Sequence, residues 1–442
     1  MTAAIRRLVA AGTLLLAALA PCASVAQGDR ATTAGSRPPT NPVVTPERGA
    51  SLEVTVLTFG QGEYVWERFG HNAIQVDDRA TGMSEVWHWG LFDFEQPNFL
   101  GRFLTGDTKY WMQGFDPASM VEAYAGYDRT ITAQRLAMTP AQKQALLDFL
   151  RWNEQDEHKF YRYDYFRDNC STRLRDALDR ALGGALQRAL LRERTDRTHR
   201  SESLRLVNEM PLTQAGMHVA LGHPADVPMT AWEEAFVPMR LRDRLRAMRV
   251  PDASGRPVPL VAEERVLYTS HREAESARAR NLVPGFLLAG LAVAALLAGM
   301  GALAVRGGRG ARATFGALGA LWGFVPGIVG VVLLLAWTVT RHDFWDRNEN
   351  LFQLGPQSLP LLVLVPLALA RPSWRGRAAR WAAVVLAIAL IGVLLKVLPM
   401  FRQPNLAIAA LAVPAHASLA WALARLARGA GARAGGKMPG VA

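Results

Sequence analysis

Three side chains of this sequence belong to the types that perform nucleophilic acyl transfer, namely Cys170, His71 and His88. Cys170 follows Asp168 and Asn169, which are favourable helix N-caps, and apolar residues recur after it at helical spacing. We therefore expect Cys170 in the first turn of a helix, where the helix dipole and free backbone N–H groups lower the pKa of a thiol. A lone cysteine is usually a small buried hydrophobic residue, but polar flanks at a helix start favour a nucleophile.

The two histidines are predicted to lie on one β-hairpin. The first strand runs from His71 to residues 77–78, and the chain returns over residues 84–90. With a loop of about six residues, His71 lies opposite residues 88–90, so both imidazoles can meet on one face. A histidine in a strand is more often structural. The thiol downstream favours a catalytic interpretation, with His71 as general base and His88 as the group that orients it.

The order of these residues, histidine before cysteine, is opposite to that of papain and indicates an α+β domain of a circularly permuted papain-like type. Further strands are predicted at 52–59 and 129–136, and helices at 117–124 and 139–153. Residues 91–110 are rich in aromatic side chains and indicate a flap or a surface that faces the substrate. Residues 187–205 are dense in arginine and are expected at the surface.

The apolar residues of this 442-residue chain, which is 50% hydrophobic, are concentrated at its two ends. Residues 1–26 have two arginines, an apolar core and a small-residue cleavage site, which predicts a secretory signal peptide. Residues 27–46 are rich in Thr, Pro and Gly and predict a disordered lead-in to a domain at 47–280. Because Cys22 lies in the signal peptide, the mature chain holds one thiol and no internal disulfide.

The region 281–428 is predicted to be a membrane domain of five helices, followed by a cytoplasmic tail at 429–442. Each apolar run can cross about 30 Å of hydrocarbon at 1.5 Å per residue. The five predicted spans are Leu282–Val305, Phe315–Thr340, Leu351–Ala370, Trp381–Met400 and Asn405–Leu423.

The basic residues predict the orientation of these spans. Arginine and lysine without acidic residues follow the first, third and fifth spans, which places these segments and the C-terminus in the cytoplasm. The domain at 47–280 is then periplasmic, on a multi-pass protein of the bacterial inner membrane. This pattern accounts for part of the net charge of +12, so the charge requires no nucleic-acid partner.

One outer loop, Arg341–Asn350, is dense in hydrogen-bonding side chains. His342, Asn348 and Asn350 are predicted to hold a lipid headgroup or an acceptor amine, although a loop of this kind can also be a solvated connector. Tyr165 and Asn169, beside Cys170, are further predicted substrate contacts. The spacing of His218, His223 and Asp226 matches no recognised ligand pattern, so no metal is predicted.

Several motifs resemble the bacterial family that has an Lnb-type N-terminal periplasmic domain, whose namesake is a lipoprotein N-acyltransferase. They are residues 69–74 (FGHNAI), 89–94 (WGLFDF), 161–164 (YRYD) and 168–172 (DNCST). The resemblance implies that Cys170 is the nucleophile and His71 the base. It also implies acyl transfer from a phospholipid to the α-amino group of a diacylglyceryl lipoprotein, without a cofactor. The family more often has asparagine where His88 stands here.

Three functions therefore compete. The first is a membrane acyltransferase that acts on lipoproteins. The second is an NlpC-like cysteine hydrolase or amidase that cuts cell-wall peptides or lipid acyl bonds, and the third is a non-enzymatic envelope protein. A membrane region of five spans favours the first over the second, because a peptide hydrolase needs only one anchor. The presence of both His71 and Cys170 disfavours the third.

Overall fold

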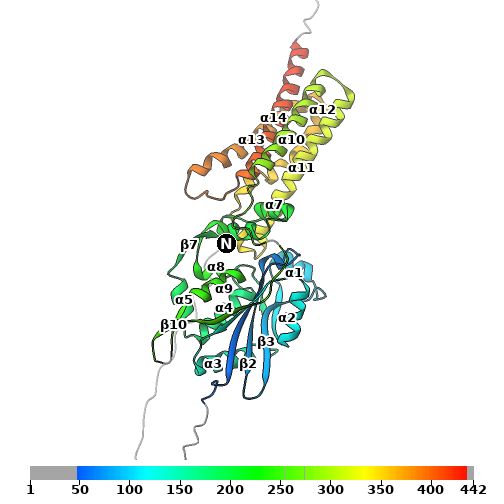
Figure 1. Ribbon diagram of the computed structural model, residues 1–442. Helices are drawn as coiled ribbons and strands as arrows, with labels where there is room; N and C mark the ends of the chain where they lie inside the picture. The colour runs from blue at the N-terminus through cyan, green and yellow to red at the C-terminus, as the bar shows by residue number, and fades with distance from the viewer. Residues whose placement is uncertain (1–46, 253, 273, 436–442) are drawn as a thin grey trace, which may run out of the picture. The chain divides into compact units, whose positions relative to one another are not determined.

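The computed structural model describes residues 47–435, apart from 253 and 273. The predicted signal peptide at 1–26, the lead-in at 27–46 and the last residues of the predicted tail, 436–442, lie outside the described residues. The described chain contains a sheet-rich domain followed by a helical membrane domain, as the sequence predicts (Figure 1).

The first domain is built on a seven-stranded antiparallel sheet with the order β11-β5-β1-β2-β3-β4-β6. The predicted hairpin forms, and its register places Ile74 opposite Trp87. The seven strands are β1 (Leu52–Phe59), β2 (His71–Asp78), β3 (Met83–Leu91), β4 (Lys109–Phe115), β5 (Ile131–Leu136), β6 (Phe160–Arg162) and β11 (Val261–Tyr268).

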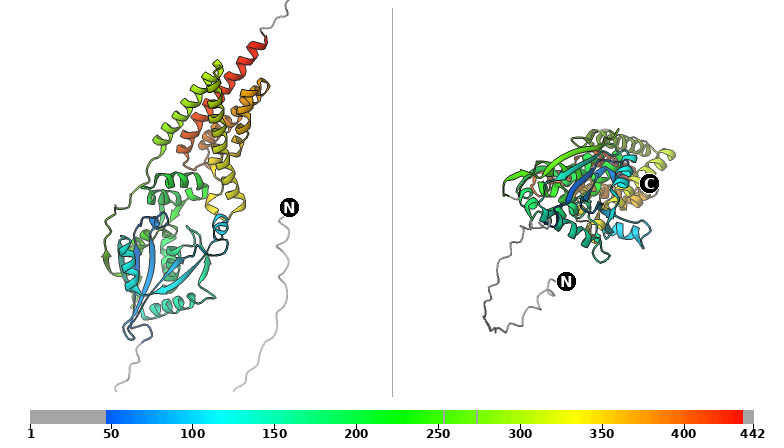
Figure 2. Two further views of the ribbon diagram at one scale, coloured as in Figure 1. Left: turned by 90° about the vertical axis from the view of Figure 1, so that its right-hand side faces the viewer. Right: turned by 60° about the horizontal axis from the view of Figure 1, so that its bottom comes forward.

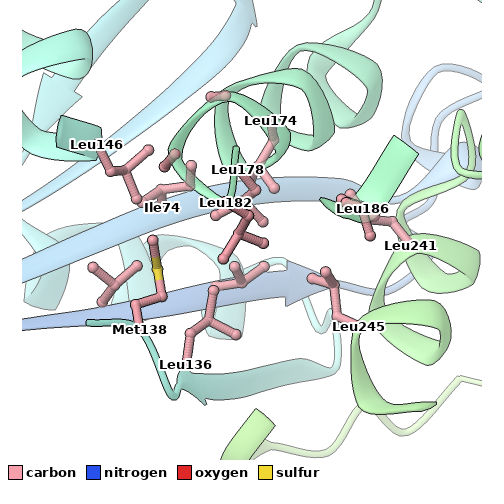
Figure 3. Close-up of a cluster of buried hydrophobic side chains, with 14 of the residues drawn as sticks. Ile74, Leu136, Met138, Leu146, Leu174, Leu178, Leu182, Leu186, Leu241 and Leu245 are labelled. Atoms are coloured by element: carbon pink, nitrogen blue, oxygen red, sulfur yellow. The ribbon is translucent and has the colours of Figure 1, made fainter. Parts of the chain in front are cut away.

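Helices cover both faces of this sheet, because its central strands are apolar on both sides. Val56 and Ile74 face one core, shown in Figure 3, while their neighbours Leu57 and Ala73 face another. The first core is covered by α3 (Pro140–Asn153), α4 (Cys170–Ala181) and α9 (Pro238–Ala247), and the second by α2 (Pro117–Gly126). The remaining elements of this domain are α1 (Phe99–Thr105), α5 (Ala185–Leu190), α6 (His199–Leu206), α7 (Pro211–Ala220), α8 (Ala231–Glu234), the pair β7 (Arg194–Thr198) and β8 (Pro228–Thr230), the pair β9 (Arg249–Pro251) and β10 (Pro257–Pro259), and the 3-10 turns η1 (Glu67–Phe69) and η2 (His223–Asp226).

The prediction that the arginine-rich segment 187–205 lies at the surface is confirmed for most of residues 187–198, which are exposed or half-buried, but is wrong for α6. Arg200, Glu202 and Arg205 of α6 are buried. Arg200 pairs with Asp226 at 2.7 Å, and Glu202 accepts hydrogen bonds from Arg205 and from Arg240 of α9. Burial is tolerated because each charge meets an opposite one and is hydrogen-bonded. These pairs tie α6 to α9 and η2 within the sheet-rich domain.

Among the residues that the structure describes, the membrane domain contains four helices long and apolar enough to span a bilayer, and five if one bent pair counts as a span. The bent pair is the predicted third span, in which residues 349–358 and 360–370 meet at 44°. The helix α14 runs alongside α10 (Figures 1 and 2). The helices are α10 (Val283–Arg306), α11 (Arg309–Val339), α12 (Pro360–Ala370), α13 (Arg375–Leu394) and α14 (Leu406–Gly435), with the 3-10 turns η3 (Asp343–Trp345), η4 (Glu349–Phe352), η5 (Pro356–Ser358), η6 (Pro372–Trp374) and η7 (Leu395–Val397).

Candidate active site

Cys170 is the first residue of α4, as predicted, and Asn169 is its N-cap. The Asn169 Oδ1 accepts the backbone N–H groups of Ser171 and Thr172, both at 2.9 Å. Its Nδ2 donates to the carbonyls of Tyr165 and Phe236. The amide is buried and all of these groups are occupied, so the structure does not favour the predicted substrate contact. Asn169 instead fixes the start of α4 and with it the position of Cys170.

The imidazole of His71 lies beside Cys170, with Gly90 next to both. His71 begins β2, and the hairpin register brings the end of β3 opposite it. A Cβ added to Gly90 would lie 3.5 Å from the Cys170 Cβ and 3.9 Å from the His71 Cε1. Gly90 also has φ of 98°, a conformation that other residues adopt at a cost. A Cβ at position 90 would therefore be in ordinary van der Waals contact with both residues, so Gly90 lies next to the thiol and the base.

His88 is hydrogen-bonded to His71, as the hairpin prediction allowed. The His71 Nε2 and the His88 Nδ1 are 2.8 Å apart, and the two rings are perpendicular. The His71 ring is also held flat against aromatic neighbours, with Tyr124 at 6.0 Å and Phe59 at 6.1 Å between centroids. The sequence does not reveal Tyr124, because it lies in α2, far from His71 along the chain, and only the fold brings the two rings together. His71 is thus fixed in orientation by a hydrogen bond and by stacking.

The expected low pKa of the Cys170 thiol is wrong for this structure. Burial raises the pKa of Cys170 to about 11, although the backbone N–H groups of Asn72, Ser171 and Cys170 act in the lowering direction. Burial also lowers the pKa of His71 well below its usual value, and the neighbouring His88 and Arg129 add to this. The same cause lowers the pKa of His88 to about 4. The resting pair is therefore a neutral thiol beside a neutral imidazole.

Arg129 is a charged residue of this site that the sequence did not point to. It is buried, its Nε donates to the Gly60 carbonyl at 2.9 Å, and its guanidinium lies 4.8 Å from the centre of the Tyr124 ring. Its Nη2 has no hydrogen-bond partner among the residues described. The positive charge lowers the pKa of Cys170 and of His71. Arg129 thus favours negative charge at the sulfur.

The outer loop meets the first domain through His342. Its Nε2 lies 3.1 Å from the Phe103 carbonyl of α1, and its Nδ1 lies 3.5 Å from the Tyr165 hydroxyl. Its ring is stacked on Trp345 at 5.2 Å. Tyr165 precedes α4 closely, so His342 and Tyr165 connect the loop to the segment that carries Cys170. The substrate contacts predicted for these two residues stay predictions.

Asn348 and Asn350 are buried against α7, whereas the sequence predicted that they hold a lipid headgroup or an acceptor amine. Both are buried, and their side-chain N–H groups donate to the carbonyls of residues 218–220, which end α7. These carbonyls have no partner within the helix, so the two amides cap α7. The arrangement favours a docking role for Asn348 and Asn350 over contact with substrate.

The residues described contain no group of three side chains placed to hold a metal ion. Of the three residues considered from the sequence, Asp226 forms an ion pair with the buried Arg200. The Arg200 guanidinium also donates to the carbonyls of residues 218, 221 and 222. This cluster therefore has a structural explanation in the packing of α6, α7 and η2.

The fold and site define a membrane protein with a sheet-rich domain that carries a buried histidine–cysteine pair. Two family sequence models match the chain: the Lnb N-terminal periplasmic domain over residues 48–208 and the Lnb transmembrane domain over residues 285–422. Together they cover more than half of its length, and the chain belongs to the Lnb family. No curated protein and no solved structure matches it. The matches support a multi-pass inner-membrane protein whose N-terminal domain is periplasmic.

The first match ends at residue 208, but the domain does not. Leu241 and Leu245 of α9 and Leu260 belong to the same core as Leu174 and Leu178 of α4. The segment after residue 208 also contacts the start of α4 directly. Ser171 Oγ donates to the Ala235 carbonyl at 2.7 Å. This extension is therefore part of the support for Cys170.

Proposed function

We propose that this protein is a cysteine-dependent acyltransferase that moves a fatty acyl group from a phospholipid to the N-terminal amine of a bacterial lipoprotein. The observation that supports it best is the juxtaposition of Cys170 and His71 across Gly90, with His88 hydrogen-bonded to the base. Membership of the Lnb family and a helical membrane domain agree with a lipid substrate.

The first half-reaction forms an acyl-Cys170 thioester. His71 takes the thiol proton through a ring nitrogen as the sulfur attacks the carbonyl carbon of a phospholipid ester. The carbonyl oxygen becomes negative, and the nearby backbone N–H of Asn72 and the Arg129 charge are placed to stabilise it. The ester C–O bond then breaks. His71 returns the proton to the departing alkoxide, and a lysophospholipid leaves.

The second half-reaction transfers the acyl group. The free α-amino group of a diacylglyceryl-cysteine lipoprotein attacks the thioester carbon, a C–N bond forms and the C–S bond breaks. His71 carries the proton lost by the amine to the departing thiolate, which restores the starting pair. His88 holds the imidazole in one orientation throughout, because it is hydrogen-bonded to His71 Nε2, which leaves Nδ1 for the proton exchange. No cofactor takes part in either step.

The test uses the full chain in nanodiscs that contain a phospholipid with an isotopically labelled acyl chain. Intact-protein mass spectrometry should detect a labelled, hydroxylamine-sensitive adduct on Cys170, and a synthetic diacylglyceryl-cysteine peptide should then gain the label as an amide. Cys170→Ser should abolish turnover. His71→Ala should slow turnover on the order of 10²-fold or more, because a positioned base contributes that much. His88→Asn should retain more activity than His88→Ala.

A matched control is His158→Ala, since His158 stacks on Trp152 and not on the proposed pair. It should leave turnover unchanged. Release of labelled fatty acid without any peptide amide would support the hydrolase alternative instead. A fully active Cys170→Ser variant would rule out the thioester route.

A further inference from the structure

The connection between β3 and β4 carries a cluster of large apolar side chains that are exposed in this structure. We call it the α1 surface: Phe94, Leu100, Phe103 and Leu104, which are 65%, 68%, 51% and 60% exposed. Exposed apolar residues that occur singly are common, but four large ones on one short segment indicate a partner that covers them. The segment also contains the aromatic residues that the sequence analysis singled out.

The α1 surface lies at the end of a membrane-spanning helix. α11 ends at Val339, which is exposed like Trp337 one half-turn earlier. Two residues later, the Arg341 backbone N–H donates to the Thr105 carbonyl at 2.9 Å, and His342 Nε2 lies 3.1 Å from the Phe103 carbonyl. The Thr105 carbonyl is the last of α1, and the Phe103 carbonyl also accepts the N–H of the C-cap residue Gly106. The end of α11 therefore caps α1.

Two further contacts hold α1 in this place. The Arg341 guanidinium lies 3.2 Å from the Asp107 carboxylate. Gly106 has φ of 73°, and a Cβ at that position would lie 3.2 Å from the Arg341 carbonyl carbon. The absence of a side chain lets the end of α1 approach the loop closely. The last turns of α11 expose Leu335, Trp337 and Val339, and this apolar end of a candidate span favours a position for α1 near the outer membrane boundary.

A continuous series of aromatic rings connects the α1 surface with the thiol. From the surface inwards, Phe103 contacts Phe99, Phe99 contacts Phe92, and Phe92 contacts Tyr110, with centroid distances of 6.2, 6.1 and 5.0 Å. Tyr110 is stacked on Tyr163 at 4.2 Å. Both tyrosines pack against the buried core cluster that contains Cys170. The rings thus form an apolar path.

We propose that the α1 surface inserts into the outer leaflet of the inner membrane and that the ring series guides a lipid acyl chain from there to Cys170. The occupant is bilayer lipid, because the surface is continuous with the lipid-facing end of α11. The side chains of the α1 surface are apolar, and carbonyl groups at the end of α1 accept hydrogen bonds from Arg341 and His342. Both properties are typical of a helix that lies in a membrane interface. The proposed insertion of the α1 surface does not depend on the proposed acyl transfer, whereas the proposed guidance of an acyl chain to Cys170 does.

The insertion is tested with the full chain in nanodiscs of phosphatidylethanolamine and phosphatidylglycerol. In a Cys170→Ser background, Leu104→Cys receives an environment-sensitive fluorophore, and lipids with a doxyl quencher in the acyl chain are added. The control site is Ala80→Cys, exposed at the turn of the β2–β3 hairpin and at the opposite end of β2 from His71. Labelling of the Cys170→Ser parent measures any background from Cys22.

The Leu104 site should show blue-shifted emission and several-fold stronger quenching than the Ala80 site. Equal, solvent-like signals at both sites would overturn the insertion. This readout does not depend on Cys170 chemistry, so it remains valid if the proposed acyl transfer fails.

The guidance of an acyl chain is tested in the chain that retains Cys170. Leu100→Ser with Leu104→Ser should reduce formation of the acyl adduct from bilayer phospholipid about tenfold. It should leave alkylation of Cys170 by iodoacetamide unchanged, which shows that the site is folded. Quenching at Leu104 together with normal adduct formation in the serine variant would keep the insertion and overturn the guidance.

Discussion

Cys170 and His71 lie close together as a neutral thiol and a neutral imidazole, because protein atoms surround both groups and desolvate them. Burial disfavours the charged form of either group, and among the described residues no carboxylate is hydrogen-bonded to His71 to offset this effect. His88 takes the orienting position instead, and it is itself held neutral by burial, with its pKa lowered to about 4. The proton must therefore move during the reaction and not before it.

This protonation state predicts the pH dependence of the pair. The thiolate fraction of a group whose pKa is about 11 rises about tenfold per pH unit at neutral pH, so the rate of Cys170 alkylation should keep rising from pH 7 to pH 9. His71 has a lowered pKa and stays unprotonated below pH 6.5, so turnover should persist to lower pH than an ordinary histidine base allows. Stopped-flow alkylation and the pH profile of kcat/KM measure both. A plateau of alkylation near pH 7 would indicate an ion pair.

The sequence is enough to identify Cys170 and His71 as candidate site residues, but it does not predict how their surroundings shift their pKa values. Cys170 and His71 could be found because a capping residue and a strand pattern surround each of them. The direction of the thiol pKa could not be found, since it depends on burial by strands and helices distant in sequence. Arg129 left no signal for a similar reason: it lies just before β5, about forty residues from Cys170, and only the sheet brings it to the site.

At the scale of the element, the start of α4 depends on one side chain. Asn169 accepts two backbone N–H groups and donates to two carbonyls from outside the helix. The sequence marks Asn169 as a cap, but its partner Phe236 lies 67 residues further along the chain and only the fold brings it to the start of α4. From the sequence alone, the Asn169 amide could have been free to contact a substrate. In the structure its oxygen and nitrogen are both occupied by hydrogen bonds within the protein.

Asn169→Ala should lower the free energy of unfolding of the periplasmic domain by about 1–2 kcal/mol, the usual loss for an N-cap. It should also slow alkylation and turnover, because the first turn of α4 carries Cys170. The matched control is Thr139→Ala, which removes the N-cap of α3 in the same domain. Thermal unfolding with alkylation kinetics compares the two. If both variants lose stability equally and Asn169→Ala keeps normal Cys170 reactivity, Asn169 does not position the thiol.

The predictions of helices and strands were right where the sequence pattern is strongly periodic. They were wrong where contacts with residues distant in sequence determine the structure. The hairpin and the helix from Thr139 formed because alternation and a capping box are local signals. The apolar run 351–370 predicted one span, and Pro356 and Pro360 interrupt its helix and produce the bend. Asn348 and Asn350 look solvated in sequence, and only the end of α7 explains their burial.

At the scale of the whole molecule, the periplasmic side of the first domain implies an orientation for every loop. Reporter fusions after Arg312 and after Arg380 should be cytoplasmic, and a fusion near Asp346 should be periplasmic, because the first two sites lie in basic segments without acidic residues. The Asp346 site serves as the internal control for reporter activity. An inverted pattern would place Cys170 in the cytoplasm and contradict the lipoprotein substrate.

Closure of the site has a consequence for the survival of the thiol in the periplasm. Oxidants and disulfide exchange act on an accessible thiolate, whereas Cys170 is 8% exposed and its pKa is raised to about 11. At pH 7 such a group is ionised in roughly one molecule in 10⁴. The sulfur is thus shielded from peroxide and from mixed disulfides between turnovers. Burial and a raised pKa should therefore slow oxidation of Cys170 relative to an accessible thiol.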